Sequence, residues 1–354
     1  MVKNTNLHKA KNAKNDEFYT QLTDVAKELM HYKKHFKDKI VFCNCDDPTW
    51  SAFWKYFHLN FAELGLKKLI STHYDREEAT YKMEYTGGDD NDIEVGVKTP
   101  LEGNGDFRNQ ECLDLLDECD IVVTNPPFSC YRSYVATLME HKKKFIIWSN
   151  NNSITYKEIF PLLKNNEMWL GYTANKTLVF RIPDTYEKWD EKETQKMNDG
   201  NHYAKVPAIS VFTNLDIEKR HEKLILWKNY TPEEYPTYDN YPGINVNKVN
   251  EIPCDYDGIM GVPITFMDSY CPEQFDIVGT ISAPSDKNTL NFGKNYSDYI
   301  GYKQDGTLYG RTGSTFGKCP VIVMDDKKHP YYEKNGIRVQ ATYHRIFIRK
   351  KVGI

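Results

Sequence analysis

The chain has 354 residues, a mass of 41.4 kDa and a formal net charge of −4. This length predicts one large domain with a second region. There is no apolar run of roughly 18 residues and no apolar signal-peptide core, which argues against membrane and secreted proteins. The eight cysteines are scattered, with Cys43 and Cys45 as the one close pair. We therefore expect reduced thiols in a cytoplasmic protein, and no metal site.

Charge is unevenly distributed along the chain. Residues 1–40 carry nine Lys/Arg against five Asp/Glu, and residues 300–354 carry eleven against four. The remainder has an excess of 15 acidic residues. Basic ends are typical of a protein that holds a polyanion by selected surfaces, although solvated surface charge would give the same count.

The N-terminal half alternates apolar runs with helical patterns, which indicates an α/β fold. After polar residues 1–15, a helix is expected around Val25 and Leu29, with Thr23 as its N-cap. The predicted strands are residues 39–43, 68–73, 121–124 and 145–148, and the predicted helices are residues 49–64, 111–118 and 130–141. The polar stretch 76–104 is expected to form a hairpin or an excursion.

The pattern changes in the second half. A helix is predicted over residues 155–166 and strands over 168–172 and 208–212, with a charged, irregular insertion over 173–206. From about Leu224 onward Pro, Tyr, Asn and Gly become frequent and helical periodicity nearly disappears. We therefore predict two domains, residues 1–230 and 231–354, the second made of short strands separated by turns.

The most informative segment is Asn125-Pro126-Pro127-Phe128. Its two prolines end the strand 121–124 and set a stiff turn past the carboxyl end, where open α/β sheets bind ligands. The segment resembles the catalytic motif of amino-methyltransferases, which use S-adenosyl-L-methionine to methylate adenine N6 or cytosine N4. A bare proline turn is the plainer interpretation, but the order strand, motif, helix, strand favours the functional one.

Acidic residues follow two other predicted strands. Asp75 could accept hydrogen bonds from both ribose hydroxyls of the cofactor. Asp106 could accept from its adenine amine while Phe107 packs on the ring; a turn aspartate and a core phenylalanine are the plainer roles. The first turn, Asn44-Cys45-Asp46-Asp47-Pro48, lacks the glycines usual in methyltransferases. A carboxylate there could contact the cofactor ammonium, and Asp46 or Asp47 could cap the next helix.

Taken together, the motifs resemble the adenine-specific DNA methyltransferases of the EcoRI type, which belong to restriction-modification systems. The resemblance covers nearly the whole chain. It rests on the motif at 125–128, the glycine-free turn, Asn15-Asp16-Glu17-Phe18-Tyr19-Thr20, and Asp257-Gly258-Ile259-Met260-Gly261-Val262-Pro263. It implies a Rossmann-like S-adenosylmethionine-dependent methyltransferase fold with a C-terminal, mostly β or irregular, target-recognition region. It also implies a monomer that flips adenine out of double-stranded DNA.

Three groups of site residues are expected on this basis. The catalytic residues are Asn125, Pro126, Pro127 and Phe128. The cofactor-binding residues are Phe18, Tyr19, Thr20, Asn44, Cys45, Asp46, Asp75, Asp106, Phe107 and Asn125. Candidate phosphate contacts are Lys303, Arg311, Lys318, Arg338, Arg345 and Arg349, and candidate base-reading residues are Asn288, Asn291 and Gln340. For any single member of the DNA set, solvated surface is the plainer role.

Alternatives stay open. The same motif type serves enzymes that methylate RNA adenine or a glutamine amide in protein, although Phe128 and the large C-terminal region favour DNA. A catalytically inactive DNA-binding protein on the same fold is the alternative of another class, and the intact Asn125 and Phe128 argue against it. The motif alone does not separate adenine N6 from cytosine N4. No obligate protein partner is expected. The resemblance suggests a companion restriction endonuclease encoded nearby.

Overall fold

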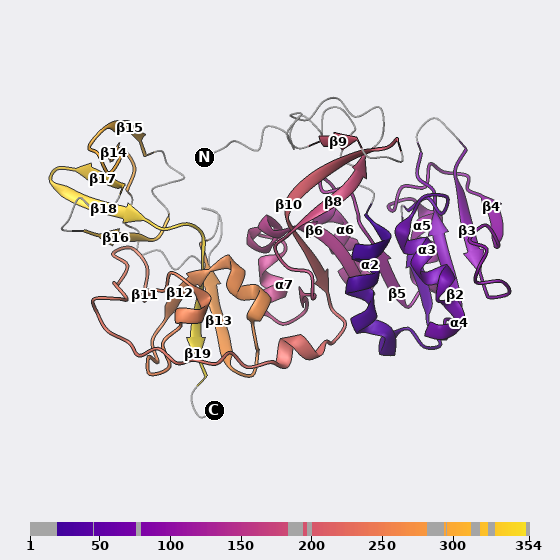
Figure 1. The fold of residues 1–354 in the computed structure, drawn as a ribbon, viewed down its shortest axis with the longest axis horizontal. Helices are drawn as coiled ribbons and strands as arrows, with labels where there is room; N and C mark the ends of the chain where they lie inside the picture. Colours follow the sequence, from indigo (N-terminus) through magenta and orange to yellow (C-terminus); the bar gives the residue numbers. More distant parts are fainter. Residues whose placement is uncertain are drawn as a thin grey trace. The chain divides into compact units, whose positions relative to one another are not determined.

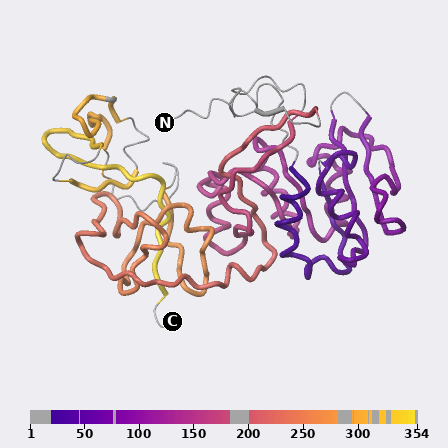
Figure 2. The backbone as a smooth tube through the Cα atoms, in the orientation of Figure 1, coloured from indigo at the N-terminus to yellow at the C-terminus, as the bar shows by residue number. Residues whose placement is uncertain are grey.

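A computed structural model describes residues 20–44, 46–75, 79–182, 194–196, 200–281, 294, 296–312, 319–324 and 330–351. The chain is a mixed α/β protein that packs into two compact units (Figure 1). The first comprises residues 1–153 and 167–217, and the second 154–166 and 218–354. The path of the chain can be followed by colour in Figure 2. Among the described residues no helix is both long and apolar enough to cross a membrane.

The first unit is built on a ten-stranded sheet with the order β4-β3-β2-β1-β5-β6-β10-β7, and β8 and β9 also pair with β10. Its four central strands are parallel: β2 (Lys68–Thr72), β1 (Ile40–Cys43), β5 (Ile121–Thr124) and β6 (Lys144–Asn150). They are buried almost throughout, which explains why their sequences are continuous apolar runs rather than alternating ones. Helix α5 (Gln110–Glu118) precedes β5, and α6 (Tyr131–Glu140) connects it to β6.

The other helices of this unit are α2 (Leu22–Leu29), η1 (Met30–His35), α3 (Ala52–Leu59) and α4 (Phe61–Leu64). Two predicted caps are wrong. The N-cap of α2 is Gln21 rather than Thr23. Helix α3 is capped by Ser51, whose hydroxyl accepts hydrogen bonds from the amides of Phe53 and Trp54, so neither Asp46 nor Asp47 is the cap.

Antiparallel strands extend the sheet on both sides. β3 (Tyr81–Tyr85) and β4 (Val97–Pro100) form a hairpin beside β2. Of the two alternatives predicted for residues 76–104, the hairpin is therefore confirmed. β10 (His202–Thr213) pairs with β6, β7 (Trp169–Leu170), β8 (Lys176–Ile182) and β9 (Thr194–Lys196). The prediction of irregular structure over 173–206 is therefore wrong for β8 and for the start of β10.

The second unit holds two smaller sheets. One has the order β11-β12-β19-β13 and the other β15-β14-β17-β18-β16. The strands are β11 (Ile244–Asn245), β12 (Met260–Pro263), β13 (Phe275–Thr280), β14 (Ile300–Tyr302), β15 (Leu308–Arg311), β16 (Val321–Val323), β17 (Tyr331–Lys334), β18 (Ile337–Ala341) and β19 (Arg345–Lys350). Ile322 of β16 and Phe347 of β19 share one buried cluster, which joins the two sheets.

Short helices complete the described chain: η2 (Asn151–Thr155), α7 (Phe160–Lys164), η3 (Glu218–His221), η4 (Val249–Glu251) and η5 (Ile264–Ser269). Helix α7 is shorter than the helix predicted over 155–166, and it belongs to the second unit. There the Lys164 ammonium donates to the carbonyl of Val278 at 2.9 Å. The division between units falls after residue 217, whereas the sequence pattern placed a boundary near residue 230.

Candidate active site

Residues 125–128 leave the carboxyl end of β5 as a fixed turn. Pro126 is buried, while Asn125 and Phe128 are partly exposed. The carbonyl of Pro127 accepts a hydrogen bond from the Cys130 amide at 2.9 Å, just before α6 begins. Phe128 packs against the main core of the first unit. The turn thus presents an amide, a proline carbonyl and an aromatic ring at one edge of the sheet, with surface left for a ligand.

The glycine-free turn after β1 is held by hydroxyl groups from the two neighbouring strands. From β5, the Thr124 hydroxyl contacts both the carbonyl oxygen of Asn44, at 2.8 Å, and a carboxylate oxygen of Asp46. From β2, the Thr72 hydroxyl donates to the side-chain oxygen of Asn44 at 3.2 Å, and the Ser71 hydroxyl donates to the carbonyl of Asp46. The turn and the residues 125–128 are therefore tied together through Thr124.

Asp46 has an unusual protonation equilibrium. Burial raises the pKa of its carboxyl to about 7, even though hydrogen bonds from Thr124 and Ser51 lower it, and the neighbouring charge of Asp47 raises it further. The hydroxyl of Ser51 donates to Asp46 Oδ1 at 3.2 Å. Asp46 can therefore gain or lose a proton, or meet a cationic ligand, close to neutral pH.

The adjacent Asp47 behaves in the opposite way. Burial would raise its pKa, but hydrogen bonds from Thr49 and Tyr81 and the nearby His73 hold it below the ordinary value. The Tyr81 hydroxyl donates to Asp47 Oδ1 at 2.9 Å, and His73 Nε2 lies 3.6 Å from Asp47 Oδ2. The Trp50 indole donates to the same Oδ2 at 2.9 Å. Asp47 thus stays ionised and organises the loop between β1 and α3.

A close backbone approach joins the end of β2 to the segment before Asp106. Gly105 has φ +73, and a Cβ atom there would overlap the carbonyl oxygen of His73. The Asp75 amide donates to the carbonyl of Asn104 at 3.2 Å. Only glycine can adopt this positive φ without strain and leave the space beside the His73 carbonyl empty. Gly105 therefore lets Asp75 and Asp106 lie on neighbouring segments.

Asp106 and Phe107 both make contacts with neighbouring residues of the chain. The Asp106 carboxylate accepts from the amide of Arg108 at 3.0 Å and from its Nε at 2.8 Å, and forms an ion pair with its Nη2. Phe107 is buried and meets Tyr134 of α6 edge to face, with ring centroids 4.9 Å apart.

A family model described as "Adenine-specific methyltransferase EcoRI" matches residues 6–351. The chain belongs to this family. Among its relatives, the Type II methyltransferase M.EcoRI of Escherichia coli is 45% identical over 287 residues, which cover 77% of this chain and 88% of that protein. M.MpnI of Mycoplasma pneumoniae is 39% identical over 280 residues, covering 78% and 86% respectively. No solved structure matches the chain significantly.

The protein is thus an adenine-specific methyltransferase, and the methyl donor of such an enzyme is S-adenosyl-L-methionine. The described residues suit that donor. Thr20 is buried, and its hydroxyl has no hydrogen-bond partner within the described parts of the chain. A buried hydroxyl normally has one, and a bound cofactor can provide it. Of the other predicted cofactor residues, Phe18, Tyr19 and Cys45 lie outside the described residues.

The predicted DNA-binding residues of this adenine methyltransferase fall into three kinds of environment. Lys303, Arg311 and Arg349 are exposed. Arg338 is partly exposed and donates to Glu333 at 2.7 Å, while Arg345 is only 7% exposed. Gln340 is partly exposed on β18. Asn288, Asn291 and Lys318 lie outside the described residues.

Several residues of the methyltransferase site were not found by the sequence analysis. They are Ser51, Ser71, Thr72, His73 and Thr124. Four of them carry hydroxyls at the end of a strand or the start of a helix beside the site, and this shared position is the signal that could have revealed them. The sequence carried no such signal for His73. In the structure its Nδ1 is buried and has no hydrogen-bond partner among the residues described.

Proposed function

We propose that this adenine-specific methyltransferase modifies N6 of adenine at one short sequence of double-stranded DNA, as the modification component of a restriction-modification system. The observation that carries the proposal is the turn at residues 125–128, tied through Thr124 to the turn after β1. This link supports the proposal because it holds residues 125–128 and the turn after β1 at one edge of a parallel sheet, where open α/β sheets bind ligands. The Type II names of the relatives support a sequence-specific DNA target.

Adenine N6 is buried in a duplex, so the base must first be flipped out. The side-chain oxygen of Asn125 and the carbonyl of Pro126 then accept hydrogen bonds from the two N6 hydrogens, while Phe128 stacks on the base. These contacts free the nitrogen lone pair from the ring. Positive charge would develop on N6 as its bond to the methyl group forms and the methyl–sulfur bond breaks. Acceptors already aimed at N6 would stabilise that charge until the nitrogen releases one proton to solvent.

S-adenosyl-L-methionine supplies an activated methyl group on a sulfonium. In the proposed site Asp46 would accept hydrogen bonds from its ammonium, Asp75 from its ribose hydroxyls, and Asp106 from its adenine amine. Phe107 packs beside the adenine. Thr20 and Asn44 contribute polar contacts near the methionine portion. The hydroxyls of Ser71, Thr72 and Thr124 hold the turn that carries Asn44 and Asp46.

We assign residues 1–230 to a Rossmann-like catalytic domain and residues 231–354 to target recognition. The parallel strands β2, β1, β5 and β6, followed by antiparallel β10, support the first assignment. The exposed basic residues of the C-terminal region support the second. DNA would contact both regions. We further propose that the enzyme works as a monomer, in the cytoplasm, alongside a companion endonuclease encoded nearby.

The test is methylation-sensitive sequencing of DNA from methylation-deficient cells that express the protein. One short motif carrying N6-methyladenine is expected. The Asn125→Ala variant should keep most of its affinity for S-adenosyl-L-methionine but lose roughly a hundredfold or more in turnover, since one aimed acceptor is gone. Soluble protein that binds the cofactor but leaves DNA unmodified would overturn the DNA assignment in favour of RNA or protein substrates. A near-normal single-turnover rate for the variant would overturn the role of Asn125.

A further inference from the structure

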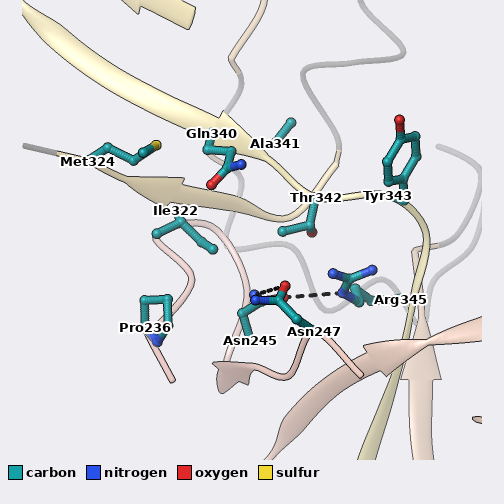
Figure 3. Close-up of a pocket in the computed structure, with 10 residues that line it drawn as sticks. All are labelled: Pro236, Asn245, Asn247, Ile322, Met324, Gln340, Ala341, Thr342, Tyr343 and Arg345. Atoms are coloured by element: carbon teal, nitrogen blue, oxygen red, sulfur yellow. Dashed lines mark hydrogen bonds between the residues drawn. The ribbon is translucent and has the colours of Figure 1, made fainter. Parts of the chain in front are cut away.

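The second unit contains a pocket of about 580 Å³ between its two sheets (Figure 3). Its polar lining comes from Asn245, Asn247, Gln340, Thr342, Tyr343 and Arg345, and its apolar lining from Pro236, Ile322, Met324 and Ala341. The volume lies within the range of ordinary ligand sites, roughly 300–1,000 Å³. No aspartate or glutamate is among these lining residues. The described wall therefore carries one cation and no anion.

That cation is fixed in place. Arg345 begins β19, pairs with Pro263 of β12, and is only 7% exposed. Its backbone carbonyl accepts from the Thr280 hydroxyl of β13 at 2.9 Å. Its Nε donates to Oδ1 of Asn245 at 3.2 Å, so the side chain is anchored by a neutral amide. The guanidinium also interacts with the Tyr238 hydroxyl, so its partners among the described residues are neutral groups. A buried positive charge without an anionic partner in the pocket wall is suited to an electron-rich ligand.

The anchor is itself buried and oriented. Asn245 is 2% exposed, and its Oδ1 also accepts from the Tyr238 hydroxyl at 2.7 Å. Its Nδ2 donates to Asn247 Oδ1 at 2.9 Å. In Figure 3 the guanidinium of Arg345 lies beside Asn245 and below the segment of Thr342 and Tyr343, with a dashed line from its Nε to Asn245. Because this bond holds Nε, the planar guanidinium lines the pocket in a set orientation.

We propose that this pocket reads a guanine of the DNA target through the two terminal nitrogens of Arg345. The inference rests on the proposed DNA methyltransferase function and names a specificity residue for it. Guanine presents O6 and N7 as paired acceptors, which match a planar guanidinium fork. Neighbouring Gln340 and Asn247 carry amides able to read base edges, and the 90% exposed ring of Tyr343 offers a stacking face.

A phosphate is the competing ligand, because the sequence analysis assigned Arg345 to the DNA backbone. Phosphate contacts are usually made by side chains that reach out from the surface and carry no sequence information. Arg345 is recessed, held by a buried amide, and surrounded by groups that suit a base. Arg349, on the same strand but exposed, has the environment expected of a phosphate contact.

The experiment begins with the wild-type enzyme and its own target duplex. Each guanine of the target is replaced in turn by 7-deazaguanine, which lacks the N7 acceptor. One position should lose on the order of tenfold in binding or methylation. In Arg345→Lys, which keeps the charge but not the fork, the same replacement should cost little, because the bidentate interaction is already absent. Arg349→Lys, the same exchange at an exposed position of the same strand, is the matched control and should keep the full sensitivity to 7-deazaguanine.

The outcomes separate the two proposals. If the wild-type enzyme methylates no DNA adenine, the proposed function fails. If it methylates DNA but no 7-deazaguanine replacement lowers binding or methylation, the pocket assignment alone is overturned. A target without guanine would have the same consequence. Equal losses by Arg345→Lys on target and non-target DNA would identify a phosphate contact and also overturn it. If Arg345→Lys does not fold, Asn247→Ala at the same pocket is the second variant. It should reduce the enzyme's preference for target over non-target DNA, and an unchanged preference counts against the proposal.

Discussion

Asp46 and Asp47 are adjacent carboxylates with opposite protonation behaviour. Asp47 accepts hydrogen bonds from Thr49, Tyr81 and Trp50, which stabilise its charge. For Asp46, burial raises the pKa to about 7 despite two hydroxyl donors. Pairs of acids whose pKa values are pushed apart are typical of functional sites. The pair supports the proposal that the turn after β1 receives a cationic ligand group.

At the residue scale, Asp46 predicts a pH-dependent cofactor affinity. Below pH 7 the carboxyl of the free protein is largely neutral, and only its charged form pairs with an ammonium. The affinity for S-adenosyl-L-methionine should therefore rise as pH increases through 7 and then level off. Asp46→Asn should bind more weakly and lose this rise, as measured by calorimetric titration on both sides of pH 7. The same pH profile in both proteins would rule out the contact.

The sequence was sufficient to select Asp46, Asp75, Asn125 and Phe128 as site candidates, because each follows an apolar run that could be identified as a strand. It was not sufficient to predict how Asp46 titrates. That property depends on Thr124, which lies 78 residues further along the chain and contacts Asp46 only because β1 and β5 pair. Local sequence patterns do not contain such pairings.

At the element scale, the ends of β1, β2 and β5 form one hydroxyl-linked edge. Thr124 is 1% exposed and precedes the turn at residues 125–128 directly. Its hydroxyl contacts Asn44 and Asp46 together, so it couples the turn after β1 to the turn at residues 125–128. Thr124 is therefore a positioning residue rather than a group that touches the substrate.

Replacing Thr124 tests that coupling. Thr124→Val keeps the shape of the side chain but removes the hydrogen bond that lowers the Asp46 pKa. The midpoint of pH-dependent cofactor binding should move upward by about one to two pH units, given the usual strength of a hydrogen bond to a charged group. Thr124→Ser keeps the hydroxyl and should restore the wild-type profile. A loss of thermal stability with an unmoved midpoint would mean that Thr124 is merely structural.

Elements also differ in how well their sequences reveal them. The buried parallel strands were found because apolar runs dominate them. β8 and the start of β10 were missed because they lie in a stretch dominated by charged residues, which outweighed the alternation of the buried Leu178, Phe180 and Ile182. In β10, Pro207 also interrupts the pattern. The register between β8 and β10 shifts between Val206 and Ile209, which is where a strand can accommodate a proline.

At the scale of the whole molecule, the second unit depends on pairings between distant segments. β12 pairs with β19, and β19 pairs with β13, although β14 to β18 intervene in the chain. Such pairings leave no local signal, so the sequence indicated short strands but not their order. The same pairings bring Arg345 beside Asn245 and create the pocket, which is why the sequence analysis named Arg345 only as a candidate phosphate contact.

The uneven charge of the molecule predicts how DNA affinity depends on salt. Lys303, Arg311 and Arg349 are exposed and belong to the basic stretch 300–354. Each neutralised phosphate contributes about 0.9 to the slope of log affinity against log salt concentration, because bound counterions are released. Changing all three residues to Gln should therefore lower the slope by about 0.9 for each phosphate that is no longer neutralised, and weaken binding to target and non-target DNA alike.

The matched control changes three exposed lysines of the first unit, Lys34, Lys37 and Lys142, to Gln. It removes the same charge from the molecule but not from the proposed docking surface. If only the net field mattered, both triple variants would lose affinity equally, because long-range attraction depends on total charge. A lower slope in the C-terminal variant alone would assign the phosphate-binding role to that surface. An unchanged slope there would exclude it as the docking surface and separate the basic stretch from DNA recognition.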